Sequence, residues 1–493
     1  MTVRVQHLRA RGLYRRRRVD VELRACMARD ANCTDCPLCC ATGLPMMTEL
    51  VRVTEAYAGG CRCGRPHVKV WLLTIRSALG VVVAAACCCA AVVATPTEKV
   101  IYSFGGAPLG ELPEASVILD AQGNLYGTTT RGGTGTQCSS SCGTVFELEP
   151  QSSGGWKETD LHSFDLIDGA YPDTPLLLDP SGNFFGVTQV GGGLGLAYEL
   201  SPGSNDAWHF QVLHRFRGNH DGQQPRGALI RDGSGTLYGT TVGGGSGGSG
   251  GNGTAFELSP SANGGWQEII VNRFRATAHG IAPQAPLVFD PAGTLYGTAS
   301  YGGNQACANG CGTAFELVPT ENGGRQLVVL HAFKGSDGSL PDAGLVPDMK
   351  GNFFGSTDEG ALTGCFGGCG VIFELSANKA HGGFTFTVLH KFDVSDGGGP
   401  EGAMMFDGAG NLYGSTVVGG NVAACPQQRG CGVVFELSPA PYGQWVYSVL
   451  HIFQNGADGA LPTGVTIDPA GNLYGTTITG GAYSLGTVFE VTP

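Results

Sequence analysis

The chain has few charged side chains and lacks the common catalytic motifs. Asp, Glu, Lys and Arg make up 14% of its 493 residues. No H-E-x-x-H or Walker sequence occurs, and no G-x-S-x-G or Rossmann fingerprint stands in the strand-and-helix context that each requires. Gly is abundant, at 82 residues, but it does not recur at every third position, which excludes a collagen-like helix. The remaining composition suits many tight turns between apolar strands.

Basic residues are scarce in most of the chain. Residues 1–95 hold 14 Lys and Arg against 6 Asp and Glu, which leaves 15 against 35 for the rest of the chain. An acidic body of this size repels phosphate backbones, so we expect no nucleic-acid partner.

The one long apolar run lies near the start. Residues 78–94 (ALGVVVAAACCCAAVVA) are uncharged, basic residues precede them, and small residues stand before a possible cut at Thr95. This pattern predicts that residues 67–95 are a signal peptide and that the protein is exported. An uncleaved anchor is the alternative, with residues 71–94 as the only membrane contact, and a lipoprotein cut before Cys87 is a third reading.

Residues 1–66 show no hydrophobic periodicity. They contain RRRR at 15–18 and six closely spaced cysteines: Cys33, Cys36, Cys39, Cys40, Cys61 and Cys63. Such spacing could serve a small zinc site. The simpler interpretation is a disordered extension or a gene start placed too far upstream.

From residue 96 onward the chain repeats one pattern. Each copy contains F-x4-D-G-x2-P, an apolar run ending in Asp, then G-N-L-Y-G-T-T, G-T-V-F-E-L-x-P, G-G-W and V-L-H-x-F, with substitutions. The aromatic residue of L-Y-G marks seven copies, spaced 53 to 61 residues apart: Tyr126, Phe185, Tyr238, Tyr296, Phe354, Tyr413 and Tyr474. This period is typical of propeller blades.

Each copy predicts four strands. The first is an apolar run such as 175–179, the second resembles 183–188, the third resembles 143–148 and the fourth resembles 156–164. The last copy lacks a fourth strand, whereas residues 100–104 form an unpaired fourth strand before the first copy. We therefore predict that residues 96–493 form an all-β, seven-bladed propeller of four-stranded antiparallel blades, closed by the N-terminal strand.

The copies of LYGTT, GTVFELSP, GGW and VLHxF resemble the Gloeo/Verruco (GloVer) tandem repeat of "choice-of-anchor" bacterial surface proteins. The resemblance covers residues 98–493. It implies export and, in many members, a C-terminal sorting anchor. It implies no established activity, and its motifs mark blade structure.

Eight cysteines occur in the loops between second and third strands. Four copies hold two, three copies hold none, and no copy holds one. This distribution favours structural disulfides over metal ligation or redox work. The expected pairs are Cys138 with Cys142, Cys307 with Cys311, Cys365 with Cys369, and Cys425 with Cys431.

Strand direction separates two faces of the expected ring. The connections from fourth to first strands and from second to third strands emerge together, on what we call the variable face, because the second-to-third loops differ between copies. We expect recognition there. Five copies place an aspartate in the fourth-to-first loop: Asp168, Asp221, Asp337, Asp396 and Asp458. These could form a ring that holds Ca²⁺, or each could simply make an Asp-Gly turn, and the regularity favours the turn.

Two other repeated positions point to structure. A histidine recurs at His162, His214, His331, His390 and His451, and a tryptophan at Trp156, Trp208, Trp266 and Trp445. One histidine per blade cannot converge on one metal, so we expect packing or a hydrogen bond. The tryptophans are interpreted as packing between blades, with sugar platforms as the alternative. Polar residues that break the repeat, namely His220, Asp358, Glu359, Arg131 and Tyr301, could form a cluster on the variable face, and the first three are candidate ligand-binding residues; solvated loop positions are the simpler interpretation.

Three functions are compatible with this sequence. The favoured one is a non-catalytic extracellular binding module for a polysaccharide or a protein, monomeric and without a cofactor other than Ca²⁺. The second is a propeller hydrolase or lyase, assisted by a cation, which requires acids or histidines converging at the channel. The third is a structural protein of the envelope.

Overall fold

The computed structural model describes residues 51–55, 71–77, 80–86, 95–139, 141–204, 207–245, 250–275, 277–361, 364–378 and 383–493. The chain forms two compact units, Met1–Val93 and Ala94–Pro493. In the first unit, three antiparallel strands make a small sheet: β1 (Val51–Glu55), β2 (Trp71–Ser77) and β3 (Gly80–Ala86). Much of the predicted extension 1–66 and of the predicted signal 67–95 lies outside the described residues, so both stay predictions. No helix in the described part is long and apolar enough to cross a membrane.

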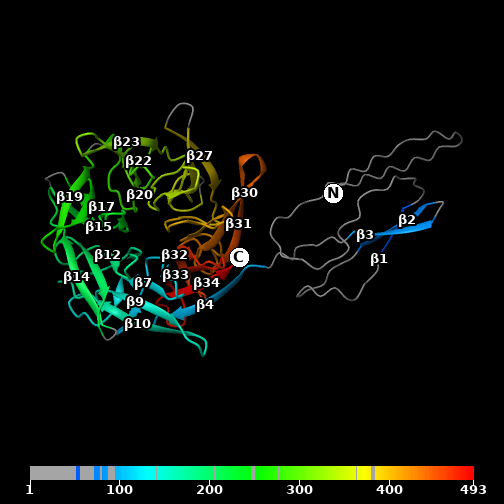
Figure 1. The fold of residues 1–493 in the computed structure, drawn as a ribbon, viewed down its shortest axis with the longest axis horizontal. Helices are drawn as coiled ribbons and strands as arrows, with labels where there is room; N and C mark the ends of the chain where they lie inside the picture. Colours follow the sequence, from blue (N-terminus) through cyan, green and yellow to red (C-terminus); the bar gives the residue numbers. More distant parts are fainter. Residues whose placement is uncertain are drawn as a thin grey trace. The chain divides into compact units, whose positions relative to one another are not determined.

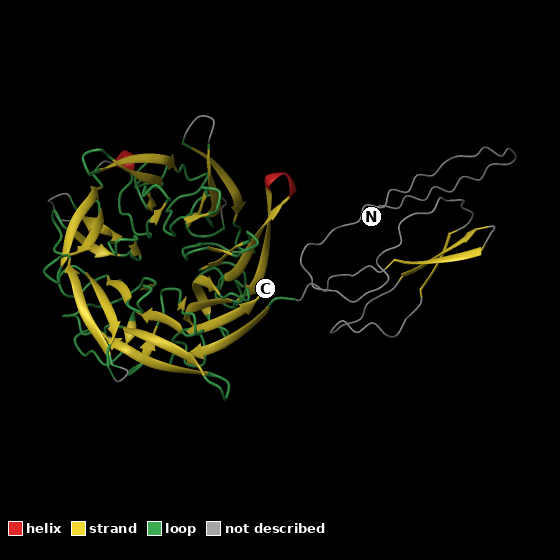
Figure 2. Ribbon diagram, in the orientation of Figure 1, coloured by secondary structure: helices red, strands yellow, loops and turns green. Residues whose placement is uncertain are grey.

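The second unit confirms the predicted seven-bladed β-propeller (Figures 1 and 2). Seven antiparallel sheets follow one another around a ring in chain order. Six of the first strands are two residues long: β6 (Ile118–Leu119), β11 (Leu177–Leu178), β16 (Ile230–Arg231), β20 (Val288–Phe289), β24 (Val346–Pro347) and β28 (Met405–Phe406). The first strand of the last blade, β32 (Ala460–Ile467), has eight residues. The second strands are fully or mostly buried: β7 (Leu125–Thr129), β12 (Phe184–Thr188), β17 (Leu237–Gly244), β21 (Leu295–Ala299), β25 (Phe353–Thr357), β29 (Leu412–Thr416) and β33 (Leu473–Thr479).

The outer half of each blade is a longer hairpin. The third strands are β9 (Thr144–Pro150), β13 (Leu196–Pro202), β18 (Thr254–Pro260), β22 (Thr313–Pro319), β26 (Val371–Ala377), β30 (Val433–Ala440) and β34 (Thr487–Thr492). The fourth strands are β10 (Trp156–Ser163), β14 (Trp208–Arg215), β19 (Trp266–Arg273), β23 (Arg325–Ala332), β27 (Phe384–Lys391), β31 (Gln444–Ile452) and β4 (Thr97–Ser103). Short additional elements are β5 (Gly110–Glu111), which pairs with β8 (Arg131–Gly132), β15 (Gly222–Pro225), which pairs with β17, and the 3-10 turns η1 (Thr277–His279) and η2 (Pro441–Gly443).

The last blade is closed by the first strand of the propeller. Its strand order is β32-β33-β34-β4, and Thr487 at the start of β34 pairs with Ser103 at the end of β4. In Figure 1 the red C-terminal strand lies beside the blue β4. Closure therefore follows the sequence prediction, and the shared sheet leaves no unpaired edge between the first and last blades.

The repeated motifs serve the packing of each blade. The Gly of L-Y-G pairs across the sheet with the aromatic residue of the third strand, as Gly127 does with Phe146. A Cβ at Gly127 would lie 2.7 Å from the Phe146 ring, so only glycine lets that ring cross the sheet. In the turn before it, Asp120 accepts hydrogen bonds from the backbone N–H groups of Gln122 and Asn124, at 2.9 and 2.8 Å. Such Asx turns explain the repeated D-x-x-G-N sequence.

All four expected disulfides are present. The bonded pairs are Cys138–Cys142, Cys307–Cys311, Cys365–Cys369 and Cys425–Cys431. The second cysteine of each pair is completely buried. The bridges thus fix the loops of the variable face against the core between neighbouring blades.

Candidate functional site

The five repeated aspartates are bound within their own blades. Asp337, for example, lies 3.1 Å from Nε2 of His331 and accepts a hydrogen bond from the backbone N–H of Lys334 at 2.7 Å. The same pairing, at 3.0 to 3.4 Å, joins His162 to Asp168, His214 to Asp221, His390 to Asp396, and His451 to Asp458. The repeated histidines thus have the structural role expected of them. The five aspartates do not line the central cavity or gather at one centre, and a ligand-binding role for them stays a prediction.

The central cavity lies on the variable face and has a volume of about 360 Å³. Every repeat contributes to it the residue that follows the invariant proline of D-G-x2-P. In chain order these seven residues are Glu114, Asp173, Arg226, Gln284, Asp342, Glu401 and Thr463. We call them the central ring. The proline holds the backbone in the same place in each blade, and the next side chain differs from blade to blade.

A second layer of side chains stands at the ends of the second strands. Thr130 donates a hydrogen bond to Glu114 at 3.2 Å, and Gln189 donates one to Asp173 at 2.8 Å. The equivalent residue in the fifth blade is Asp358, on which the charges of Glu401 and Asp342 act. In this blade, therefore, the second layer adds a further acid where the others offer neutral partners.

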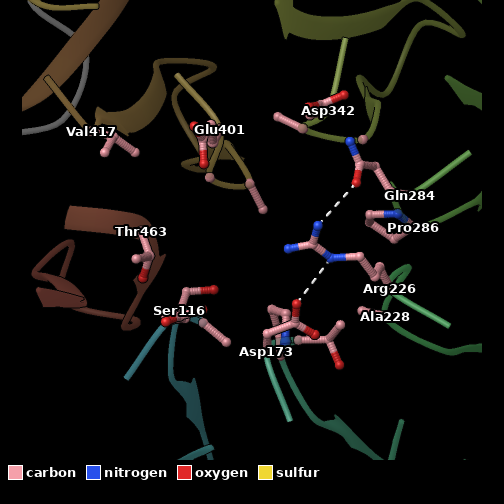
Figure 3. A pocket seen from close by; sticks show the side chains of 18 of the residues that line it. Ser116, Asp173, Arg226, Ala228, Gln284, Pro286, Asp342, Glu401, Val417 and Thr463 are labelled. Atoms are coloured by element: carbon pink, nitrogen blue, oxygen red, sulfur yellow. Dashed lines mark hydrogen bonds and ion pairs between the residues drawn. The ribbon is translucent and has the colours of Figure 1, made fainter. Parts of the chain in front are cut away.

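Arg226 is the only basic side chain among the described residues that line the cavity. Its Nε donates to Asp173 at 3.0 Å and its Nη1 donates to Gln284 at 3.3 Å. Figure 3 shows the guanidinium reaching into the cavity between these two residues, with Glu401 and Thr463 across from it. The Arg226 side chain is 43% exposed, so it can also contact a ligand.

Two carboxyl groups of the central ring are deeply buried with unused hydrogen-bonding capacity. The Asp173 side chain is 5% exposed, and its Oδ1 has no hydrogen-bond partner. Asp342 is buried to a similar extent, and its Oδ1 also lacks a partner. Burial raises the pKa of both groups, although Arg226 opposes the shift at Asp173 and Ser300 opposes it at Asp342. Unsatisfied oxygens of this kind are what a ligand donor can complete.

The acids of the cavity also repel one another. Burial, followed by the charges of Glu401 and Asp342, raises the pKa of Asp358 to about 8. Burial and the charge of Asp342 raise the pKa of Glu401 to about 6, against the opposing effect of Arg226. Burial likewise raises the pKa of Glu114. Near neutral pH a protonated carboxyl, at Asp358, therefore lies near the ring, while Glu401 within the ring is mostly ionised and can accept hydrogen bonds.

The three residues that break the repeat separate into two places. Asp358 does not line the cavity but lies close enough to two lining residues, Glu401 and Asp342, for their charges to act on it. Glu359 follows it, with its backbone paired to Ser339 and its pKa raised by burial and by Asp342. His220 instead lies in a shallow depression at the outer strands of the second and third blades, beside Asp221. The same depression holds His214, Asp221 and Glu268, which are the only described residues that bring three possible metal donors within 4.8 Å of one another.

The sequence prediction missed the central ring. It treated D-G-x2-P as the feature of interest and did not compare the residues that follow the proline. The signal was present, because the most variable polar position of the repeat stands directly after an invariant residue. The tryptophans, by contrast, pack between blades as expected: Trp266 meets Phe185 and Trp445 meets Phe354, both edge to face.

Two solved structures are similar to this chain in fold. The Pseudomonas aeruginosa periplasmic gluconolactonase PpgL is 17% identical, with a TM-score of 0.43 and coverage of 74% of this chain and 96% of its own. A Dyadobacter fermentans protein of unknown function is 12% identical, with a TM-score of 0.37 and coverage of 80% and 97%. At these values neither likeness bears on activity. No curated protein sequence matches the chain.

The repeat itself matches a known family along the propeller. The model of the Gloeobacter/Verrucomicrobia repeat matches residues 89–250, 193–366 and 361–493. These matches include all seven blades and agree with the resemblance seen in the sequence motifs. The chain belongs to the Gloeobacter/Verrucomicrobia repeat family.

Proposed function

We propose that this protein is an exported, non-catalytic binding module that holds its ligand in the central cavity. The main support for this proposal is the central ring. Its seven positions share one backbone location but carry different polar side chains, whereas the residues that build the blades repeat. A scaffold has no need for this variety, and a binding site does.

The charge of the cavity favours a ligand that carries cationic groups. Four ring carboxyls stand against one guanidinium. A polysaccharide with amino sugars has the required chemistry, because its ammonium groups bind carboxylates and its hydroxyl groups both donate and accept hydrogen bonds. A cavity of about 360 Å³ is at the small end of ligand sites, which suits one or two sugar units of a longer chain.

The disulfides support the proposed location. Four bridges within loops persist in an oxidising compartment and are rare in the cytosol. With the predicted signal segment, they favour a periplasmic, extracellular or cell-surface location.

One observation favours hydrolase or lyase activity as a second candidate. The charge of Glu401, which lines the cavity, acts on nearby Asp358, and the pKa values of Asp358 and Glu401 are raised to about 8 and about 6. Carboxyl groups whose pKa values are pushed apart are what acid–base catalysis on glycosides uses. Asp358 near the acids of the ring supports this candidate, whereas His220 lies in a separate depression and does not.

The test is calorimetric titration of the full chain with glucosamine oligosaccharides and with their N-acetylated and neutral counterparts. We expect binding of the amino form, weakened at least about tenfold by Glu401→Gln or Asp342→Asn, because each removes a charge-assisted hydrogen bond. Glu321→Gln, an exposed glutamate outside the cavity, is the matched control and should bind as the unaltered chain does.

Mass spectrometry of the oligosaccharides after incubation distinguishes the two candidates. Intact oligosaccharide supports the binding module. Shortened products that disappear with Glu401→Gln would favour the enzyme. Equal binding by all variants, or none by the unaltered chain, would contradict the proposed role of the cavity.

A further inference from the structure

The fourth strands of neighbouring blades meet at a repeated contact, which we call a seam. The histidine of one blade lies beside the side chain two positions after the tryptophan position of the next. In three seams this neighbour is aromatic and stacks on the imidazole, with ring centroids 4.1 Å apart for His162 and Phe210, 3.6 Å for His331 and Phe386, and 3.9 Å for His390 and Tyr447. These three seams are closed by packing alone.

In three other seams a glutamate takes the aromatic position. Glu158 accepts a hydrogen bond from Tyr102, which replaces the histidine there. Glu268 lies beside His214, and Glu98 lies close enough to His451 for the two charges to interact. The second and sixth blades therefore present a histidine and an aspartate to the glutamate of the next blade.

The seam between the second and third blades has the geometry of a metal site. Nε2 of His214 lies 3.3 Å from Oδ1 of Asp221 and 3.7 Å from Oε2 of Glu268. Ligands bound to one zinc ion at its usual bond lengths and tetrahedral angles are separated by roughly 3.3–3.6 Å. In the three stacked seams the corresponding His–Asp distances are shorter, at 3.0 to 3.1 Å, as expected for a simple pair.

The surroundings leave this position accessible and incomplete. Oε1 of Glu268 is buried and has no hydrogen-bond partner. The three donors line a depression that is open to solvent, together with His220, Arg217 and Arg273. Arg273 opposes a cation here, but its Nη2 donates to the backbone carbonyl of His220 at 3.3 Å, which holds part of the guanidinium outside the triad.

We propose that His214, Asp221 and Glu268 form a binding site for Zn²⁺ that links β14 of the second blade to β19 of the third. Two carboxylates balance the charge of the ion, and the imidazole nitrogen favours zinc over Ca²⁺, which prefers oxygen ligands. The fourth coordination position faces the depression and is open to water or a ligand group. This site is separate from the central cavity and does not depend on the function proposed for it.

The test is equilibrium dialysis of the oxidised full chain against Zn²⁺, with metal content measured by mass spectrometry. The N-terminal cysteines, such as Cys33 and Cys36, could bind zinc on their own, so free thiols are alkylated first. We expect one zinc per chain, and at least about tenfold weaker binding by Glu268→Gln. X-ray absorption of the bound zinc should show nitrogen and oxygen ligands with one imidazole and no sulfur.

Two further variants serve as controls for zinc binding. Glu98→Gln alters the equivalent glutamate of the seam between the sixth and last blades, where the donors do not come within 4.8 Å, and should leave zinc binding unchanged. Glu268→Phe restores the aromatic seam found elsewhere, so it should fold and lose the zinc. Equal zinc binding by the unaltered chain and both Glu268 variants would overturn the proposal, as would an unaltered chain that binds no zinc.

Discussion

The two ends of a single connection carry opposite kinds of residue. Between β23 and β24, Asp337 bonds to His331 and to the backbone of Lys334, whereas Asp342, five residues later, has a buried oxygen without a partner. The outer aspartate recurs in five of seven repeats, and the residue at the inner position changes from repeat to repeat. In this repeat protein the position that recurs belongs to the scaffold, whereas the polar position that varies beside an invariant residue belongs to the candidate site.

The largest effect on stability should come from reducing the four disulfides of the variable face. Each disulfide closes a loop of five to seven residues, which is worth roughly 2 kcal/mol, so reduction of all four should lower the free energy of unfolding by several kcal/mol. Urea denaturation with and without reductant measures this. Substitutions in the central ring should not approach that loss, and an unchanged midpoint on reduction would contradict the role given to the bridges.

The next effect should separate the two aspartates of one loop. Asp337→Ala removes a partner of His331 and of a backbone N–H, so we expect a loss of about 2–3 kcal/mol in unfolding free energy. Asp342→Ala removes a buried acid whose pKa is raised, so near neutral pH it should be neutral or stabilising. Parallel urea titrations of the two variants measure both changes in unfolding free energy. Equal losses would contradict the different roles given to Asp337 and Asp342.

The acidic cavity should make stability depend on pH. Asp358 has a folded pKa of about 8, above its usual 3.8, so the folded state binds its proton more tightly than the unfolded state does. Its contribution to the free energy of unfolding is therefore greatest below about pH 4 and declines as pH rises towards 8. Asp358→Asn should remove this decline and raise the unfolding free energy at pH 8 by on the order of 2 kcal/mol. Melting temperatures from pH 4 to 8 test this, and parallel curves for the two proteins would be the contrary result.

The smallest effect should come from the one cation of the ring. Arg226→Gln leaves the buried Asp173 without its ion pair, and because the Arg226 side chain is 43% exposed we expect a loss of only about 1 kcal/mol in unfolding free energy near neutral pH. Since Arg226 lowers the pKa of Asp173 against burial, the loss should shrink as pH falls and Asp173 takes up a proton. Denaturation at pH 7 and pH 4 measures both values, and a loss that grows in acid would contradict the pairing.

The scaffold could be predicted from the sequence because the motif that specifies each blade element recurs from copy to copy. Seven copies of L-Y-G-T-T, an isolated fourth strand at the start and its absence at the end define blade number and closure. The paired cysteines of single loops needed no three-dimensional information either. Local patterns of this kind are visible in one alignment of the copies.

The contacts between blades were harder to predict. The His–Asp pairing was within reach, since the two copies that lack the histidine, at Tyr102 and Asn272, also lack the aspartate, at Leu109 and His279. The interaction of Glu401 with Asp358 was not, because these residues belong to two neighbouring repeats and come close only where the fifth and sixth blades meet. Likewise, only the structure shows that Glu268, two positions after a tryptophan, faces the histidine of the preceding blade.

The closing strand has a consequence for how the molecule is made. β4 is the first strand of the propeller to be synthesised, but its partner β34 is the last, so the pairing of Ser103 with Thr487 must wait for nearly the whole chain. Until then the nascent ring has two open edges that can pair with other chains. Contacts this distant in sequence form slowly, so cells that produce this protein have reason to shield the unfinished ring until its two ends meet.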